Sequence, residues 1–152
     1  MTYRIILFLI INFAALAIGG LATTKAVTGD WYLHLNKAPW TPPGWVFGAA
    51  WTTIMVCFSF YMAYAWEKVE NHNLLLTLFI IQWILNVAWN PVFFTWHYTL
   101  LGLIVITLLS LLIIYFLFHY MPELRLKSIL ILPYVIWLMI ATSLNAYVYL
   151  KN

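Results

Sequence analysis

Hydrophobic residues gather in five long runs along the chain, at residues 3–24, 44–66, 74–94, 100–120 and 128–150. A helix needs about 20 apolar residues to cross the roughly 30 Å hydrocarbon core of a membrane, and each run is long enough. The connections after the second, third and fourth runs are short, so neighbouring helices should be antiparallel and adjacent. The pattern predicts an all-α integral membrane protein in which residues 1–152 form one domain, a five-transmembrane-helix bundle.

The connection between the first two runs, residues 26–43, is unlike an ordinary solvent-exposed loop. It is rich in aromatic residues and proline and carries little charge. Pro39, Pro42 and Pro43 exclude a regular helix across its middle, although one helical turn fits near residues 31–35. A segment of this composition is expected to be ordered, folding back to pack against the apolar bundle.

Composition agrees with a membrane protein, because 66% of the 152 residues are hydrophobic and only 7% are charged. A soluble domain of this size has too little interior to bury so much apolar side chain. The seven basic and four acidic residues all fall outside the runs or at their ends. Charged side chains in mid-membrane usually mark ion paths or proton relays, so this distribution argues against an ion-coupled pump.

Charge and targeting signals also bear on location and partners. Four basic residues on the side of the N-terminus, against three on the other, favour the N-terminus inside. No cleavable signal or transit peptide is recognisable, which fits a bacterial cytoplasmic membrane. The basic residues are scattered, so no nucleic-acid partner is expected. The four histidines lack the i, i+4 spacing of a metal site on one helix, and Cys57 is alone, so no metal is expected.

The third run contains three amide side chains spaced four residues apart, Gln82, Asn86 and Asn90. That spacing places them along one helical face. Amides in lipid need partners, so this face should point into the bundle. The face either makes interhelical hydrogen bonds or forms a polar strip that orients a ligand. Pro91 follows, and its missing N–H predicts a kink with a free acceptor at Val87.

Three other helices carry candidate features. The fifth run has two aromatic residues, a small residue and an amide at 3-4-4 spacing, namely Tyr134, Trp137, Ala141 and Asn145. This face suits either a concave ligand-binding wall or ordinary packing. In the second run, the indole N–H of Trp51 needs an acceptor when buried and could anchor a ligand carbonyl or carboxylate. In the first run, Gly19 and Gly20 would allow close helix approach.

Three motifs occur in order along the chain. The first comprises Trp31-Tyr32, Leu35, Lys37, Pro39-Trp40, Pro42-Pro43 and Trp51. The second comprises Gln82, Leu85-Asn86, Trp89, Pro91 and Phe93-Phe94. The third comprises Pro133-Tyr134, Trp137, Ala141 and Leu144-Asn145. Together they resemble the motifs of the TspO/translocator protein family, the tryptophan-rich sensory proteins related to the peripheral benzodiazepine receptor.

The resemblance implies a five-helix bundle, often dimeric, with a pocket beneath the first loop. The implied ligands are protoporphyrin IX, haem-like molecules and hydrophobic drugs such as isoquinoline carboxamides or benzodiazepines, and eukaryotic relatives bind cholesterol. A homodimer and a sterol-like lipid are therefore expected partners; porphyrin would be ligand or substrate, with no cofactor required. Carried over residue by residue, the ligand-binding candidates are Tyr32, Trp40, Pro42, Trp51, Asn86, Asn90, Phe93, Trp137, Ala141 and Leu144.

Set above the amide and aromatic faces, the loop of residues 26–43 would act as a lid. Three functions stay open at this point. The chain could be a membrane binding protein or sensor for tetrapyrroles, an enzyme that degrades protoporphyrin IX with light and oxygen, or a transporter of small hydrophobic or anionic solutes. For the enzyme, Trp51 and Trp137 are the candidate catalytic residues, because indole is the most easily oxidised ring at hand.

Overall fold

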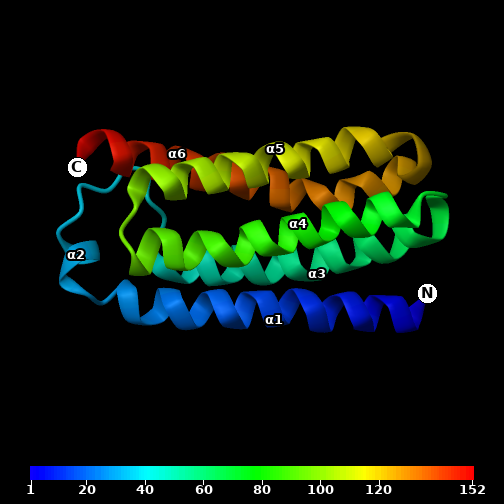
Figure 1. Cartoon of the computed structure of the whole chain (residues 1–152), viewed down its shortest axis with the longest axis horizontal. Coiled ribbons are helices and arrows are strands. Elements are labelled where there is room, and N and C mark those ends of the chain that lie inside the picture. The colour runs from blue at the N-terminus through cyan, green and yellow to red at the C-terminus, as the bar shows by residue number, and fades with distance from the viewer.

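The computed structural model describes residues 1–152 and is entirely helical. Five long helices lie roughly along one axis (Figure 1). Their bounds are Thr2–Ala26 (α1), Gly44–Lys68 (α3), His72–Asn90 (α4), Thr99–Leu124 (α5) and Leu132–Lys151 (α6). Helices α3 and α4 occupy the middle of the bundle, with α1 on one side and the α5–α6 pair on the other. The five-helix bundle predicted from the hydrophobic runs is confirmed.

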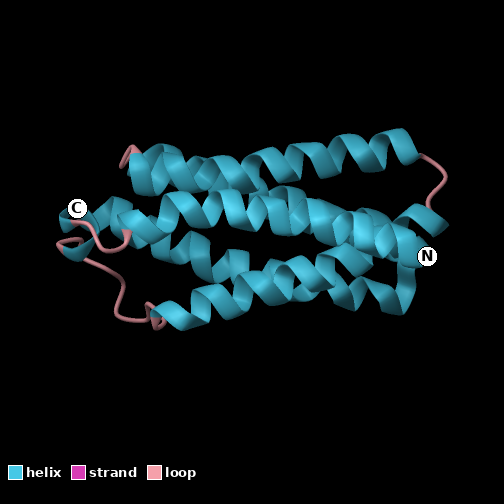
Figure 2. Cartoon of the chain, turned by 90° about the horizontal axis from the view of Figure 1, so that it is seen from below, coloured by secondary structure: helices cyan, strands magenta, loops and turns pink.

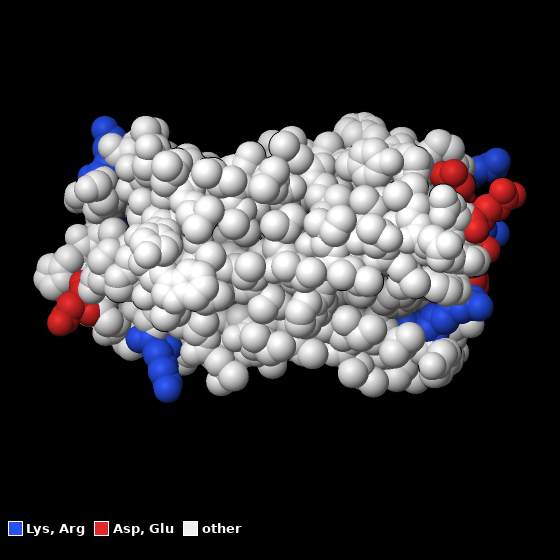
Figure 3. Space-filling view, viewed as in Figure 1, with Lys and Arg blue, Asp and Glu red and all other residues white.

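The bundle has the dimensions and charge distribution of a membrane-spanning domain. Four helical stretches are long and apolar enough to cross a membrane, and the last, Thr99–Lys151, is 53 residues long. This stretch turns back at Arg125, so it supplies two spans. Acidic and basic side chains gather at the two ends of the molecule and leave its middle uncharged (Figure 3). The chain is an integral membrane protein.

The turn between α5 and α6 differs from the expected one. The sequence placed the end of the fourth helix before Pro122, but α5 continues through this proline to Leu124. Including Pro122 in the helix costs little, because only two helical residues follow it and few hydrogen bonds are lost beyond the one that proline cannot donate. Arg125 then takes a positive φ of 49°, and a 3-10 segment, Arg125–Ile131 (η2), leads into α6. Helix α6 therefore begins at Leu132, four residues later than expected.

Helix α4 changes its winding at Pro91, where the sequence predicts a kink. Residues Pro91–Thr95 (η1) form a π-helical turn, closed by a hydrogen bond from Trp96 N to Pro91 O at 2.9 Å. Proline cannot donate the amide hydrogen bond of a regular helix, and the wider turn accommodates that gap. The insertion rotates the residues after it, so that Phe93 and Phe94 both become buried beneath the lid end of the bundle.

Helix α1 is joined to α3 and α4 by polar contacts inside the bundle. Asn12 Nδ2 donates to Ser59 Oγ at 2.8 Å, and both side chains are buried. Nearer the lid, α1 approaches α4 so closely that a Cβ on Gly19 would lie 2.5 Å from Asn90 Nδ2. The expected close approach of helices is thus confirmed at Gly19, but it is wrong at Gly20, where a Cβ would meet nothing within 4 Å. Small residues permit such contacts, and buried amides in lipid are satisfied by neighbouring helices.

The connection between α1 and α3, residues 27–43, covers one end of the bundle. It holds one short helix, Asp30–Leu33 (α2), followed by a proline-containing segment without regular structure. The connection leaves α1, passes the C-terminal end of α6 and returns to the start of α3 (Figures 1 and 2). We call residues 27–43 the lid.

Candidate ligand-binding site

Aromatic rings attach the first half of the lid to η1 and the residues just after it. The Trp31 ring stacks on His97 with centroids 4.0 Å apart, and it meets Phe93 edge-on at 5.7 Å. Tyr32 lies against Phe94 at 5.7 Å. Such aromatic pairs add to the stabilisation from buried area alone, so α2 is held on the π-helical turn.

The second half of the lid is attached to α6. Trp40 Nε1 donates to Ser143 Oγ at 3.1 Å, and the Trp40 ring packs edge-on against Tyr147. Asn36 N donates to Asn152 Oδ1 at 2.9 Å, and Asn152 Nδ2 donates back to Asn36 O at 3.3 Å. These contacts fasten the lid to the last turns of α6.

Beneath the lid, on the side of α1, lies a cavity of about 510 Å³. This volume falls in the range of about 300–1,000 Å³ found for small-molecule sites. We call it the large cavity. Its walls come from α1, the lid, α3 and α4, and the residues that line it are Ala15, Leu16, Gly19, Gly20, Thr23, Thr24, Val27, Tyr32, Lys37, Thr41, Pro42, Gly44, Phe47, Gly48, Trp51, Asn86, Trp89, Asn90 and Phe94.

A second, smaller cavity of about 40 Å³ lies on the side of α6. It is lined by Tyr32, Lys37, Thr41, Phe47, Trp51, Trp89, Phe93, Phe94, Trp137, Ala141, Leu144, Asn145 and Val148. Seven of these residues also line the large cavity, so one wall of side chains separates the two spaces. Trp51 and Phe47 belong to this shared wall.

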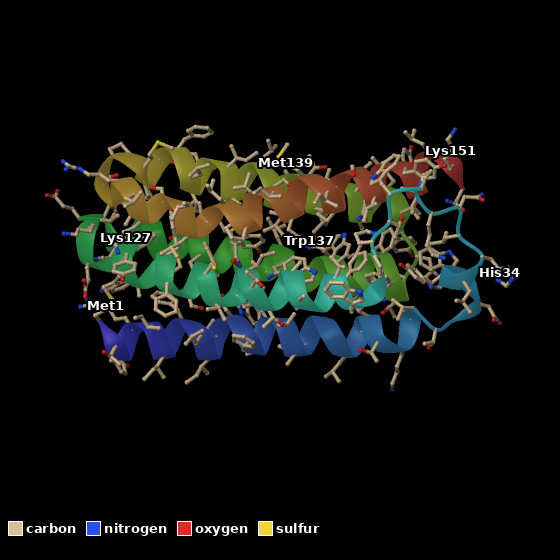
Figure 4. The ribbon with its side chains drawn as sticks, turned by 180° about the vertical axis from the view of Figure 1, so that it is seen from behind. Met1, His34, Lys127, Trp137, Met139 and Lys151 are labelled. Atoms are coloured by element: carbon tan, nitrogen blue, oxygen red, sulfur yellow. The ribbon has the colours of Figure 1, made fainter.

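One polar group in the small cavity has no partner. Trp137 is buried, and its Nε1 makes no hydrogen bond within the protein. Figure 4 shows Trp137 in the interior of the bundle and Met139 on the outer face of the same helix. A buried donor without an acceptor is unfavourable. The nitrogen exposes less than 1 Å², so a ligand oxygen could bond to it only after neighbouring side chains move.

Lys37 is the only charged residue that lines either cavity. Its ammonium donates to the Tyr32 carbonyl at 2.8 Å and lies over the Tyr32 ring, 4.6 Å from the centroid. No carboxylate lies within ion-pair distance of it. An ammonium has three donors, so two remain free for an acidic ligand. Burial raises the pKa of the Tyr32 hydroxyl, which keeps this neighbour neutral.

The amide face of α4 combines the two roles that its spacing left open. Asn86 and Asn90 line the large cavity. Asn90 is also bound to α1, because Thr23 Oγ1 donates to its Oδ1 at 2.8 Å. Gln82 lies further from the lid, fully buried, and lines neither cavity, and its Oε1 has no hydrogen-bond partner. The face is thus interhelical contact in one part and cavity wall in another.

The residues singled out from the sequence divide between the cavities. Those that line the large cavity are Tyr32, Pro42, Trp51, Asn86 and Asn90. Those that line the small cavity are Tyr32, Trp51, Phe93, Trp137, Ala141 and Leu144. Trp40 lines neither, because its ring lies on the outer side of the lid against α6.

Sequence reasoning missed the wall that α1 contributes. Gly20, Thr23 and Thr24 line the large cavity from that helix. A run of small and hydroxyl residues near the end of the first apolar run is the signal for it, and of these residues only Gly19 and Gly20 were singled out, for helix packing. Phe47 was also missed, although it lies one helical turn before Trp51 and so on the same face of α3.

Sequence comparisons agree with this architecture. Residues 7–150 match the profile of the TspO/MBR family. The Tryptophan-rich protein TspO of Archaeoglobus fulgidus is 34% identical over 145 residues, which cover 91% of this chain and 92% of that protein. The Tryptophan-rich sensory protein of Cereibacter sphaeroides is 33% identical over 131 residues, 85% of this chain and 82% of that protein. The human Translocator protein is 28% identical over 146 residues, 90% of this chain and 85% of that protein. The chain therefore belongs to the TspO/MBR family.

Proposed function

We propose that the protein is a membrane receptor for tetrapyrroles such as protoporphyrin IX and haem-like molecules, which it holds beneath the lid. Hydrophobic drug-like molecules with a carbonyl or carboxylate, such as isoquinoline carboxamides and benzodiazepines, would use the same space. The observation that carries the proposal is the large cavity of about 510 Å³ whose only charged lining group is the ammonium of Lys37. The name of the sensory relative is consistent with a receptor.

The lining of both cavities is complementary to a flat, apolar molecule that carries acidic groups at one edge. Trp51, Trp89 and Phe94 supply ring faces on the wall that the cavities share. Lys37, at the lid, can pair with a carboxylate near the aqueous boundary, where an ionised group costs less to accommodate. Asn86 offers an amide further inside.

Quenching of tryptophan fluorescence by protoporphyrin IX in the purified, reconstituted protein tests the proposal. Wild type should show saturable quenching, and Asn86→Ala and Trp51→Phe should each weaken the affinity. Trp45→Phe is the matched control, because Trp45 is 75% exposed on the outside of α3 and lines neither cavity. Affinities in both cavity variants that equal the Trp45→Phe value would refute this site.

A second candidate function, oxidation of bound porphyrin with light and oxygen, is favoured by one observation. Trp51 and Trp137, two oxidisable indoles, line the same small cavity. Illumination of the protein with protoporphyrin IX under oxygen should then change the porphyrin spectrum faster than illumination of free porphyrin. A rate equal to that of free porphyrin, or an unchanged rate in the Trp51→Phe, Trp137→Phe double variant, would reject the enzymatic function.

A further inference from the structure

The large cavity reaches the outer surface of the bundle between α1 and α3. Three of the residues that line it, Gly44, Gly48 and Thr24, are also among the exposed residues of the protein. At Gly20, Gly44 and Gly48, a Cβ would meet nothing within 4 Å. These three glycines therefore border open space rather than a packed helix interface. We call them the glycine seam.

The surface on either side of the glycine seam is apolar. Trp45, next to Gly44, is 75% exposed, and Leu21, next to Gly20, is also 75% exposed. Both belong to membrane-spanning helices, near their lid ends. Tryptophan is enriched where hydrocarbon meets headgroups, so the seam opens toward lipid just below that boundary.

The lid is closed on the opposite side of the bundle. Its hydrogen bonds from Asn36 and Trp40 go to α6, and the rings of Trp31 and Tyr32 pack on η1 and His97. The one side-chain hydrogen bond from the lid to α1 is local, from Thr28 Oγ1 to Lys25 O at 3.1 Å, and no aromatic contact joins the two. Lifting the lid away from α6 and η1 would therefore break several contacts together, whereas passage through the glycine seam breaks none of them.

We propose that the ligand reaches the large cavity sideways from the bilayer, through the glycine seam, while the lid stays closed. The ligand class is a planar amphiphile that partitions into lipid with its acidic edge at the headgroups. Its apolar body would pass between α1 and α3 beside the three glycines, which carry no Cβ, and its carboxylate would remain at the depth of Lys37. This route rests on the proposed function, because it assigns the access path to that same cavity.

The test compares a blocked seam with a blocked lid in liposomes that contain the full chain. Gly48→Leu places a side chain in the seam, and Ala49→Leu is its matched control, because Ala49 is exposed on the same helix and lines neither cavity. The lid is locked by joining Asn36→Cys to Asn152→Cys with a short bismaleimide, which adds one thiol at each end, in a Cys57→Ser background, with cross-linking confirmed by mass spectrometry. Stopped-flow quenching gives the association and dissociation rates of protoporphyrin IX.

Gly48→Leu should slow association by about tenfold, within the range over which on-rates vary among variants of one site, and should slow dissociation as well. Ala49→Leu and the locked lid should both match wild type. A locked lid that slows association several-fold, or a Gly48→Leu rate equal to that of Ala49→Leu, would overturn the lateral route while leaving the receptor function intact. If Gly48→Leu speeds dissociation without slowing association, the leucine occupies space that the bound ligand needs, and the lateral route is wrong in that case too. Wild type that binds no porphyrin would overturn the receptor function and the route together.

Discussion

Replacing Lys37 by methionine should separate acidic ligands from neutral ones. Methionine keeps most of the apolar stem but removes the only charge that lines the cavities. Two opposite charges about 4 Å apart interact by roughly 1 kcal/mol in water and roughly 4 kcal/mol near a protein surface. Lys37 is half-buried, so we take a value of about 2 kcal/mol, which corresponds to an affinity loss of about 30-fold.

The assay is a fluorescence titration with protoporphyrin IX and, in parallel, with its dimethyl ester, which has the same ring and no carboxylate. Lys37→Met should weaken binding of the acid about 30-fold and change binding of the ester less than about threefold. Lys37→Arg, which keeps the charge, should retain most of the affinity for the acid. Equal losses for acid and ester would mean that Lys37 acts by shaping the lid. No loss for either would place the acidic edge elsewhere.

Three further variants test the packing around the site. Gly19→Ala should lower the thermal unfolding temperature by an amount equivalent to about 1–3 kcal/mol, because its Cβ would lie 2.5 Å from Asn90 Nδ2. Gly20→Ala should not lower it, and an equal loss in both would contradict the close-approach argument. Asn152→Ala removes two hydrogen bonds to the lid and should speed amide exchange there, with no change in α3. Burial raises the pKa of Tyr32 above its ordinary value of 10.0, so the neutral phenol stabilises the closed lid fully below about pH 10 and progressively less above it. Proteolysis of the lid should therefore speed up as the pH rises above this value, and Tyr32→Phe should abolish that increase. An unchanged increase in Tyr32→Phe would mean that another group causes it.

Hydrophobicity alone was enough to predict five membrane-spanning helices, but not how the chain winds at its prolines. Pro122 and Pro91 look alike in the sequence, since each falls near the end of an apolar run. Only two residues of α5 follow Pro122, so the helix tolerates it. Pro91 is followed by residues that continue the span, and the chain adopts a π-helical turn there. How far a helix must continue depends on tertiary packing, which no local pattern contains.

The candidate site was predictable where spacing along one helix decides it. The interval of four between Asn86 and Asn90 correctly implied a shared face, and both line the large cavity. Contacts between distant segments were not predictable in this way. Trp40 suits a lid by residue type, but its ring is directed outward by Ser143, 103 residues later. The hydroxyl that binds Asn90 comes from Thr23, 67 residues earlier, and no motif linked the two.

The absence of side chains at Gly20 and Gly48 has a consequence for how the family can diversify. Glycine inside a helix costs about 1 kcal/mol relative to alanine, so each position could gain stability by a single substitution that clashes with nothing. Every such gain would shrink the cavity. If the large cavity binds a bulky ligand as proposed, selection for that ligand and selection for a robust fold act in opposite directions on the same two residues. Relatives that recognise smaller molecules would be free to replace these glycines, so the side chains found there should report the size of a family member's ligand.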